Sequence, residues 1–402
     1  MGPRNAPLDG LRALSAVAVI HIHCLAPFFV KNAPAWQDPM RSVLDFATPS
    51  FFFLSGFFSP RDPRRGLAKR LLRIVVPYAV ATFTHEALTF IAQSVRHGIW
   101  SEVVHELALT NLREHWHGDC LLHEKLPMYR DLFAFGPPAS PGKAALEHFV
   151  LGTSFGFYYF VVVLIQLQLL APLLAKIETP RAWHAVLAAA VAVSLLFRIG
   201  GLIWLVGKDD GGFAIKVTLR LPMTFVGFFV AGFYTRHFFL ETAGRAAVQT
   251  RCRAAVALGG LALLAVFASR ALDASEELKL TCREPFLYAM PTAVALYGAQ
   301  KADGDAAQGR VSKRLCALRD DLSRCAYAMY LYHGFFNEDS LASLHVARLF
   351  HKGFWPRGLE VTLVTFLFVR GIADCLQADV SARYFGIAPA ATQPDDKALS
   401  NL

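Results

Sequence analysis

The sequence has few charged residues and lacks the short motifs that mark metal-binding and disulfide-rich proteins. Only 18% of its residues are charged and 54% are hydrophobic, which excludes an ordinary soluble protein and is typical of a polytopic membrane protein. Its seven cysteines contain no CxxC pair, so neither a zinc site nor a disulfide scaffold is indicated. An HExxH motif is absent as well, and we expect no metal.

Acidic residues are fewer than basic ones, and the net charge is +9. Such an excess can indicate nucleic-acid binding, but here the lysines and arginines lie in short segments between apolar runs. Orientation in a membrane explains this placement, because cytoplasmic loops are enriched in Lys and Arg. We therefore expect membrane lipids, and no nucleic acid, among the partners.

Ten apolar runs are long enough to cross roughly 30 Å of hydrocarbon, which predicts an all-α, polytopic bundle of about ten transmembrane helices. The runs cover residues 11–31, 41–60, 74–95, 148–175, 183–206, 217–237, 254–272, 284–300, 323–345 and 358–378. The segments between alternate runs are denser in Lys and Arg than the loops that face them. These segments are 61–73, 176–182, 236–253 and 301–322. The positive-inside rule then places both termini in the cytoplasm.

The chain divides into one long domain and a short tail. We expect residues 1–380 to form the transmembrane domain, with an external loop at 96–147 that is too long for a simple connector. Residues 381–402 are polar and contain proline, so we expect a disordered cytoplasmic tail. Pairing of Cys120 in the loop with Cys282 stays open, and the sequence gives no indication of the oligomeric state.

The first apolar run contains an arginine and two histidines. Ionisable side chains are costly at bilayer depth, so they are functional candidates. Arg12 and His23 are eleven residues apart, which places them on one helix face, about 16 Å apart along the axis. His21 falls on the opposite face, where packing against a neighbouring helix is expected. Arg12 and His23 are therefore catalytic candidates, with hydrogen-bonded packing as the alternative for the histidines.

Three cations follow the second run. Lys69, Arg70 and Arg73 share one helical surface at i, i+3 and i+4 spacing. Arginine offers a fork of donors to phosphate oxygens and lysine adds a point charge, so the cluster is a candidate cofactor-phosphate site. Membrane topology alone also requires basic residues here, and anionic lipid headgroups could use them.

Other polar residues lie inside the apolar runs. Glu86 is the only acidic residue well inside the third run, where it could orient or activate a catalytic histidine or pair with Arg220. Ser55, in the stretch FFFLSGFF, is a cofactor-site candidate. A packing role is the alternative. A nucleophilic role is less expected than packing, because the serine does not lie in the strand-turn-helix elbow of serine hydrolases. So many buried polar groups predict a polar interior cavity. The substrate-binding candidates are Gln166, Arg220, Tyr330 and His333. For His333, packing is an equally good alternative.

Four stretches, taken together and in this order, resemble the integral-membrane acyltransferase-3 family. They are LDGLRALSAVAVIHIH (8–23), PSFFFLSGFF (49–58), KRLLRIVVPY (69–78) and CAYAMYLYHGFF (325–336). The resemblance implies that His23 is the catalytic histidine, that Arg12 is its partner towards the cytoplasm, and that the 69–73 cations contact coenzyme A phosphates. Two departures are the additional His21 and Gly334 in place of a common proline.

The resemblance implies an O-acyltransferase. It would move an acyl group, typically acetyl, from cytosolic acyl-CoA (acetyl-CoA) to a hydroxyl of a glycan or lipid-linked sugar, in the bacterial cytoplasmic (inner) membrane. His23 could act as general base or carry the acyl group itself. The alternative is a secondary transporter that uses the buried His, Glu and Arg residues as a proton or substrate path.

Overall fold

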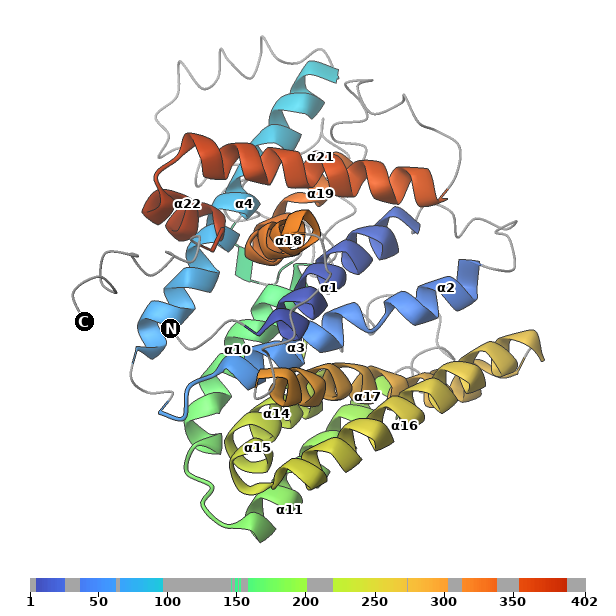
Figure 1. The fold of residues 1–402 in the computed structure, drawn as a ribbon. Helices are drawn as coiled ribbons and strands as arrows, with labels where there is room; N and C mark the ends of the chain where they lie inside the picture. Colours follow the sequence, from blue (N-terminus) through green and yellow to red (C-terminus); the bar gives the residue numbers. More distant parts are fainter. Residues whose placement is uncertain are drawn as a thin grey trace.

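The computed structural model describes residues 5–25, 37–62, 66–96, 146, 149–150, 152, 158–200, 220–272, 274–302, 313–337 and 354–388. Every long regular element in these ranges is a helix (Figure 1). The first part of the chain forms α1 (Ala6–Leu25), α2 (Gln37–Leu44), α3 (Ala47–Phe58), α4 (Leu67–Arg96), α10 (Tyr159–Leu174), α11 (Pro180–Leu195) and η2 (Leu196–Gly200). The second part forms η3 (Pro222–Thr224), α14 (Val226–Tyr234), η4 (Thr235–Phe239), α15 (Leu240–Thr242), α16 (Arg245–Ala271), α17 (Glu276–Ala302), α18 (Lys313–Tyr332), α19 (Gly334–Asn337), α21 (Phe354–Cys375) and α22 (Ala378–Phe385).

Each of the ten predicted apolar runs contains helix, so the all-α prediction is confirmed. The second run is divided into α2 and α3 by a turn at Asp45 and Phe46. Pro49 does not break this run, because it lies in the first turn of α3, where a backbone N–H has no intrahelical acceptor. The sixth run changes from a 3-10 turn (η3) through α14 to a π-helical turn (η4).

Helix α1 is the centre of the arrangement (Figure 1). It packs against α18 and α21 on one side and against α3 and α17 on the other. Helices α16 and α17 form a long pair at the edge of the molecule, and α11 packs against α14. The buried core runs through all of these contacts, so α1 is held by neighbours from both halves of the chain.

Two glycines let α3 and α14 touch backbone to backbone. A Cβ atom added at Gly56 would overlap the carbonyl oxygen of Phe229, and one at Gly232 would overlap that of Phe53. Small residues at a helix crossing allow this approach in membrane proteins, where dispersion contacts hold helices together. Beside this crossing, the Phe52 ring of α3 lies 4.6 Å from the rings of Phe160 in α10 and of Phe225, the residue before α14.

The exterior of the bundle is apolar in several places. Within the described ranges, the segments Pro180–Gly200 and Arg245–Ala271 are long and apolar enough to cross a membrane, and α10 is apolar but shorter. Large exposed apolar side chains are Val256, Leu258, Leu261, Leu264 and Phe267 on α16, and Leu359, Leu363, Val364, Leu367 and Phe368 on α21. Contiguous apolar surface of this kind favours contact with lipid.

The ordered C-terminal region extends beyond the expected domain boundary at residue 380. Helix α22 packs against α4, and Ile387 is buried. The Ala388 N–H donates to the Arg324 carbonyl at 3.1 Å, and Arg324 Nε donates back to the Ala388 carbonyl at 3.0 Å. Residues 381–388 are therefore part of the fold. The remainder of the expected tail lies outside the described residues, as do Cys120 and the external loop except for its ends at Arg96 and Leu146.

We expect Gly56→Val to destabilise the protein by about 1–3 kcal/mol, because the added atoms would force α3 and α14 apart. Thermal unfolding of the purified protein in detergent measures the effect. The control is Gly371→Ala in α21, where nothing lies within 4 Å of the added Cβ. Its melting temperature should stay the same or rise slightly, because alanine favours helix. Equal melting temperatures for the two variants would contradict the close crossing.

Candidate active site

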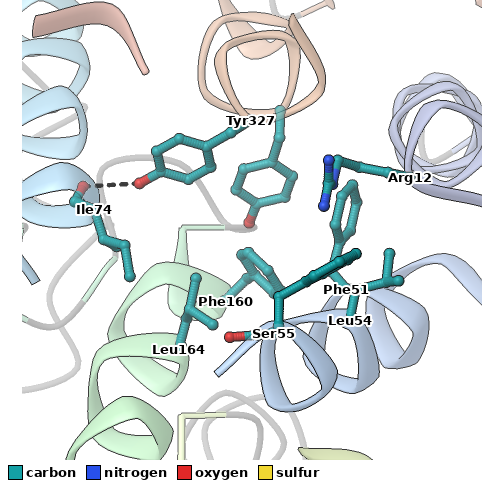
Figure 2. A pocket seen from close by; sticks show the side chains of 10 residues that line it. Arg12, Phe51, Leu54, Ser55, Ile74, Phe160, Leu164 and Tyr327 are labelled. Carbon is teal, nitrogen blue, oxygen red and sulfur yellow. Dashed lines mark hydrogen bonds between the residues drawn. The ribbon is translucent and has the colours of Figure 1, made fainter. Parts of the chain in front are cut away.

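A cavity of about 230 Å³ opens between α1, α3, α4, α10 and α18 (Figure 2). Its lining residues are Arg12, Phe51, Leu54, Ser55, Phe58, Ile74, Phe160, Leu164, Tyr327 and Tyr330. Arg12 and Ile74 lie on opposite sides of it in the view of Figure 2. Three of the predicted site residues therefore meet here although they come from three different helices: Arg12, Ser55 and Tyr330.

The Arg12 guanidinium is held by polar partners. Its Nη1 lies 3.2 Å from Oδ1 of Asp9 and donates to Oγ of Ser323 at 3.3 Å. The Ser323 hydroxyl also donates to Asp9 Oδ1 at 2.9 Å. The guanidinium carbon lies 5.1 Å from the centre of the Phe58 ring, a cation–π contact. A charge that is paired, oriented and still one-third exposed can act on a ligand in the cavity.

Helices α1 and α18 run parallel, and this sets the two ends of the site. Near one end, Arg12 of α1 contacts Ser323 of α18. His23 comes eleven residues after Arg12, and His333 comes ten residues after Ser323; their rings lie 5.3 Å apart. Both spacings correspond to a rise of roughly 15–16 Å. The prediction that Arg12 and His23 share a helix face is thus confirmed.

His21 points to a different helix. A Cβ added at Gly358 of α21 would overlap its ring, and its Nδ1 lies 2.9 Å from the Val17 carbonyl oxygen. Because a carbonyl can only accept, this Nδ1 carries the hydrogen. The prediction that His21 packs against a neighbouring helix is confirmed, and this packing separates its role from that of His23.

His23 does not line the cavity but is connected to it through two side chains. Tyr330 forms part of the cavity wall, and its ring lies 6.0 Å from that of His333, which contacts His23. His333 is fully buried, and its Nδ1 donates to the Tyr330 carbonyl at 2.8 Å. His23 itself is half-buried. The order cavity, Tyr330, His333, His23 therefore leads from the Arg12 end towards the other end of α1.

Gln168, not the predicted Gln166, is the glutamine of α10 that bonds to a lining residue of the cavity, although neither glutamine lines the cavity itself. Its Nε2 donates to Ser55 Oγ at 2.6 Å. Phe160, Leu164 and Gln168 follow one another at i, i+4 and i+8 and share a face, whereas Gln166 lies on another side of the helix. The spacing from Phe160 and Leu164 was the sequence signal that could have identified Gln168.

The three cations begin α4, directly before the cavity residue Ile74. Lys69 and Arg73 are exposed and Arg70 is half-buried. Partial burial lowers the pKa of the Arg70 guanidinium, and the nearby Asp62 carboxylate partly offsets this by raising it. Arg70 remains charged, because arginine does not lose its proton in proteins. The Ile74 carbonyl accepts a hydrogen bond from the Tyr327 hydroxyl at 2.8 Å (Figure 2), which joins the start of α4 to α18 beside the cavity.

The remaining predicted residues lie elsewhere in the bundle. Glu86 is buried, and its Oε1 lies 4.0 Å from Nδ1 of His85, its neighbour in the sequence. Arg220 is half-buried just before η3 and interacts electrostatically with Tyr78 and Tyr159. Neither Glu86 nor Arg220 lines the cavity.

The sequence analysis missed two sets of charged residues. One is Asp9, although its i, i+3 spacing to Arg12 could have indicated a pair. The other is an ion network at the opposite end of the bundle. There Arg198 Nε donates to both carboxylate oxygens of Glu284 at 2.9 and 3.1 Å, and Arg283 pairs with Asp45. Arg198 also lies over the rings of Phe225 and Phe228, at 5.4 Å from each.

Within the part of the chain that the structure describes, no group of three or more His, Cys, Asp or Glu side chains could hold a metal ion. The described cysteines are all free thiols, and three of them are buried: Cys24, Cys252 and Cys325.

One protein family matches most of the chain. Its model, which describes an acyltransferase domain of the acyltransferase-3 type, matches residues 5–372. The match includes every residue that lines the cavity, together with His23 and His333, and it ends before α22. No curated protein and no solved structure matches the chain.

The buried pair of Arg198 and Glu284 gives a test of the ion network. Glu284→Leu should destabilise the protein by about 3–5 kcal/mol, because it leaves a buried guanidinium without its carboxylate. Adding Arg198→Met should recover much of this loss, which thermal unfolding measures. The control is Glu241→Ala, which breaks the exposed pair with Arg61 and should cost less than about 1 kcal/mol. If the double variant is as unstable as Glu284→Leu, the unpaired Arg198 guanidinium is not the cause of the lost stability.

Proposed function

Because the chain belongs to the acyltransferase-3 family of integral-membrane O-acyltransferases, we propose that it transfers an acyl group, acetyl in the first instance, from cytosolic acyl-CoA to a hydroxyl group of a sugar. The acceptor is a glycan or lipid-linked sugar at the outer face of a bacterial cytoplasmic membrane. The observation that supports this most is the cavity lined by Ile74, which follows the 69–73 cations in α4, and by Tyr330. The Tyr330 ring contacts that of His333, which in turn contacts that of His23. Membership of this family favours the enzyme over the transporter hypothesis.

The donor enters from the end of the bundle that carries the cations. Lys69, Arg70 and Arg73 stand together at the start of α4, where the helix dipole is also positive. Like charges concentrated in this way favour a multivalent anion, such as the phosphates of coenzyme A. The pantetheine arm then extends past Ile74 into the cavity.

Arg12 acts on the donor and not directly on the catalytic imidazole. Its eleven-residue separation from His23 corresponds to about 16 Å along α1, too far for a hydrogen bond. The guanidinium lines the cavity in which the donor would lie, and Asp9 with Ser323 fixes its direction. Arg12 therefore stabilises negative charge on the bound donor.

His23 carries the transfer. Neutral imidazole can take the proton of the acceptor hydroxyl as general base, or accept the acyl group in a two-step reaction. In either case His23 passes through a cationic form, and an acceptor nitrogen nearby stabilises it. His333 supplies such a nitrogen, because its Nδ1–H bonds to the Tyr330 carbonyl and leaves Nε2 as the acceptor.

The acceptor approaches from the opposite end. The ion network of Arg198, Glu284, Arg283 and Asp45 lies where the topology with cytoplasmic termini puts the outer face, and the Arg12 and Arg61 pairs lie at the other end. The separation of these two groups of ion pairs supports a topology of ten spans with both termini in the cytoplasm. The parallel course of α1 and α18 supports it as well.

The remaining predicted residues have roles around the transfer. Tyr330 and His333 contact the transferring acyl group, and Arg220 and Gln166 contact the acceptor. Glu86 acts through His85.

We expect His23→Ala to reduce acyl transfer by the purified enzyme at least 100-fold, the scale of acid–base catalysis by one side chain. Turnover is measured as release of free coenzyme A thiol in the presence of the acceptor glycan. The matched control is His21→Ala two residues away, which loses packing against Gly358 and should keep activity within tenfold. Equal losses in the two variants would remove His23 from the mechanism.

Coenzyme A should raise the melting temperature of the protein, because a ligand that binds only the folded state stabilises it. The shift should shrink strongly in the variant Lys69→Gln/Arg70→Gln/Arg73→Gln and at high salt, since exposed cations are screened. Arg61→Gln is the control, because Arg61 is exposed at the same end but pairs with Glu241. An undiminished shift in the triple variant would place the phosphates elsewhere.

A further inference from the structure

The contact between Ser55 and Gln168 leaves two hydrogen-bonding groups unused beside the cavity. Gln168 Nε2 donates to Ser55 Oγ at 2.6 Å, so the serine oxygen acts as acceptor and its own hydrogen remains. No described residue accepts a bond from that hydroxyl. Gln168 is only 6% exposed, and its Oε1 has no hydrogen-bond partner among the described residues. The pair thus offers one donor and one acceptor side by side.

An unsatisfied carbonyl in an apolar interior is costly, and native structures contain few of them. The lining around Ser55 makes this one more unusual, because Leu54, Phe160 and Leu164 are apolar. Leucine in place of Gln168 would fill the same space without the penalty. The amide is therefore better explained by a ligand than by packing.

The chemistry of the cavity indicates which ligand group fits. A secondary amide presents one N–H and one C=O, the complement of the Gln168 carbonyl and the Ser55 hydroxyl. The apolar walls suit methylene groups on either side of that amide. A sugar in this position would bring several hydroxyls against Leu54 and Leu164, where nothing could satisfy them.

Building on the proposed function, we propose that Ser55 and Gln168 form a subsite that recognises an amide of the pantetheine arm of acyl-CoA. The Ser55 hydroxyl donates to the amide carbonyl, and Gln168 Oε1 accepts the amide N–H. The position agrees with this assignment, because Ser55 shares the cavity with Ile74, which follows the phosphate-binding cations, and with Tyr330, which leads to His23. Gln168 thereby also becomes a binding residue that distinguishes pantetheine thioesters from simple acyl phosphates.

The test compares two ligands of the purified full-length protein. Coenzyme A carries the pantetheine arm, whereas adenosine 3′,5′-bisphosphate contains only the nucleotide end. We expect Gln168→Leu to weaken coenzyme A binding about tenfold and to leave the affinity for the bisphosphate unchanged in calorimetric titrations. The control Gln249→Leu, on the exposed face of α16 and away from the cavity, should change neither affinity. Without ligand, Gln168→Leu should melt at the same temperature as the wild type or higher, because it removes an unsatisfied polar group.

Ser55→Ala provides a second measurement that does not depend on how Gln168→Leu folds, and it should weaken coenzyme A binding selectively as well. The subsite is refuted if either variant binds coenzyme A like the wild type, or if both ligands weaken equally in Ser55→Ala. A lower melting temperature for Gln168→Leu with unchanged coenzyme A affinity would make the glutamine a packing residue. Failure of the wild type to bind either ligand would instead overturn the proposed function itself.

Discussion

The interaction of Arg12 with Asp9 and Ser323 sets the position of α1 against α18, and the site depends on that position. A lone arginine within a membrane helix costs about 2.5–3.5 kcal/mol on insertion scales, so the carboxylate and the hydroxyl must compensate it. Because α1 and α18 run parallel, fixing Arg12 beside Ser323 at one end brings His23 beside His333 at the other. One polar contact thus determines where the histidine pair lies.

The close crossing of α3 and α14 has the complementary effect. Gly56 and Gly232 remove the side chains that would hold the two backbones apart, and the phenylalanines of α3 then pack against α10. Ser55 is next to Gly56, so the same crossing presents its hydroxyl to Gln168 and to the cavity. Packing by small residues and recognition by polar residues are therefore parts of one arrangement.

The ends of the bundle differ in their electrostatics. At one end Lys69 and Arg73 of α4 are exposed and Arg70 is half-buried, so this end carries excess positive charge. At the other end Arg198 pairs with Glu284, and Arg283 pairs with Asp45. The α4 cations attract an anionic donor to the first end. This network joins η2, α17 and the α2–α3 turn, so it holds these elements together.

Periodicity and composition determined the helical class, the ten apolar runs and the shared face of Arg12 and His23, because these properties depend on spacing along one helix. The family resemblance added the roles expected of His23 and the 69–73 cations, and the family match confirms the family. That Gln168 bonds to Ser55, that Ser323 bonds to Arg12, and that His333 lies beside His23 were decided only by tertiary structure. Each depends on how helices distant in sequence are rotated against one another, and local spacing does not specify that rotation.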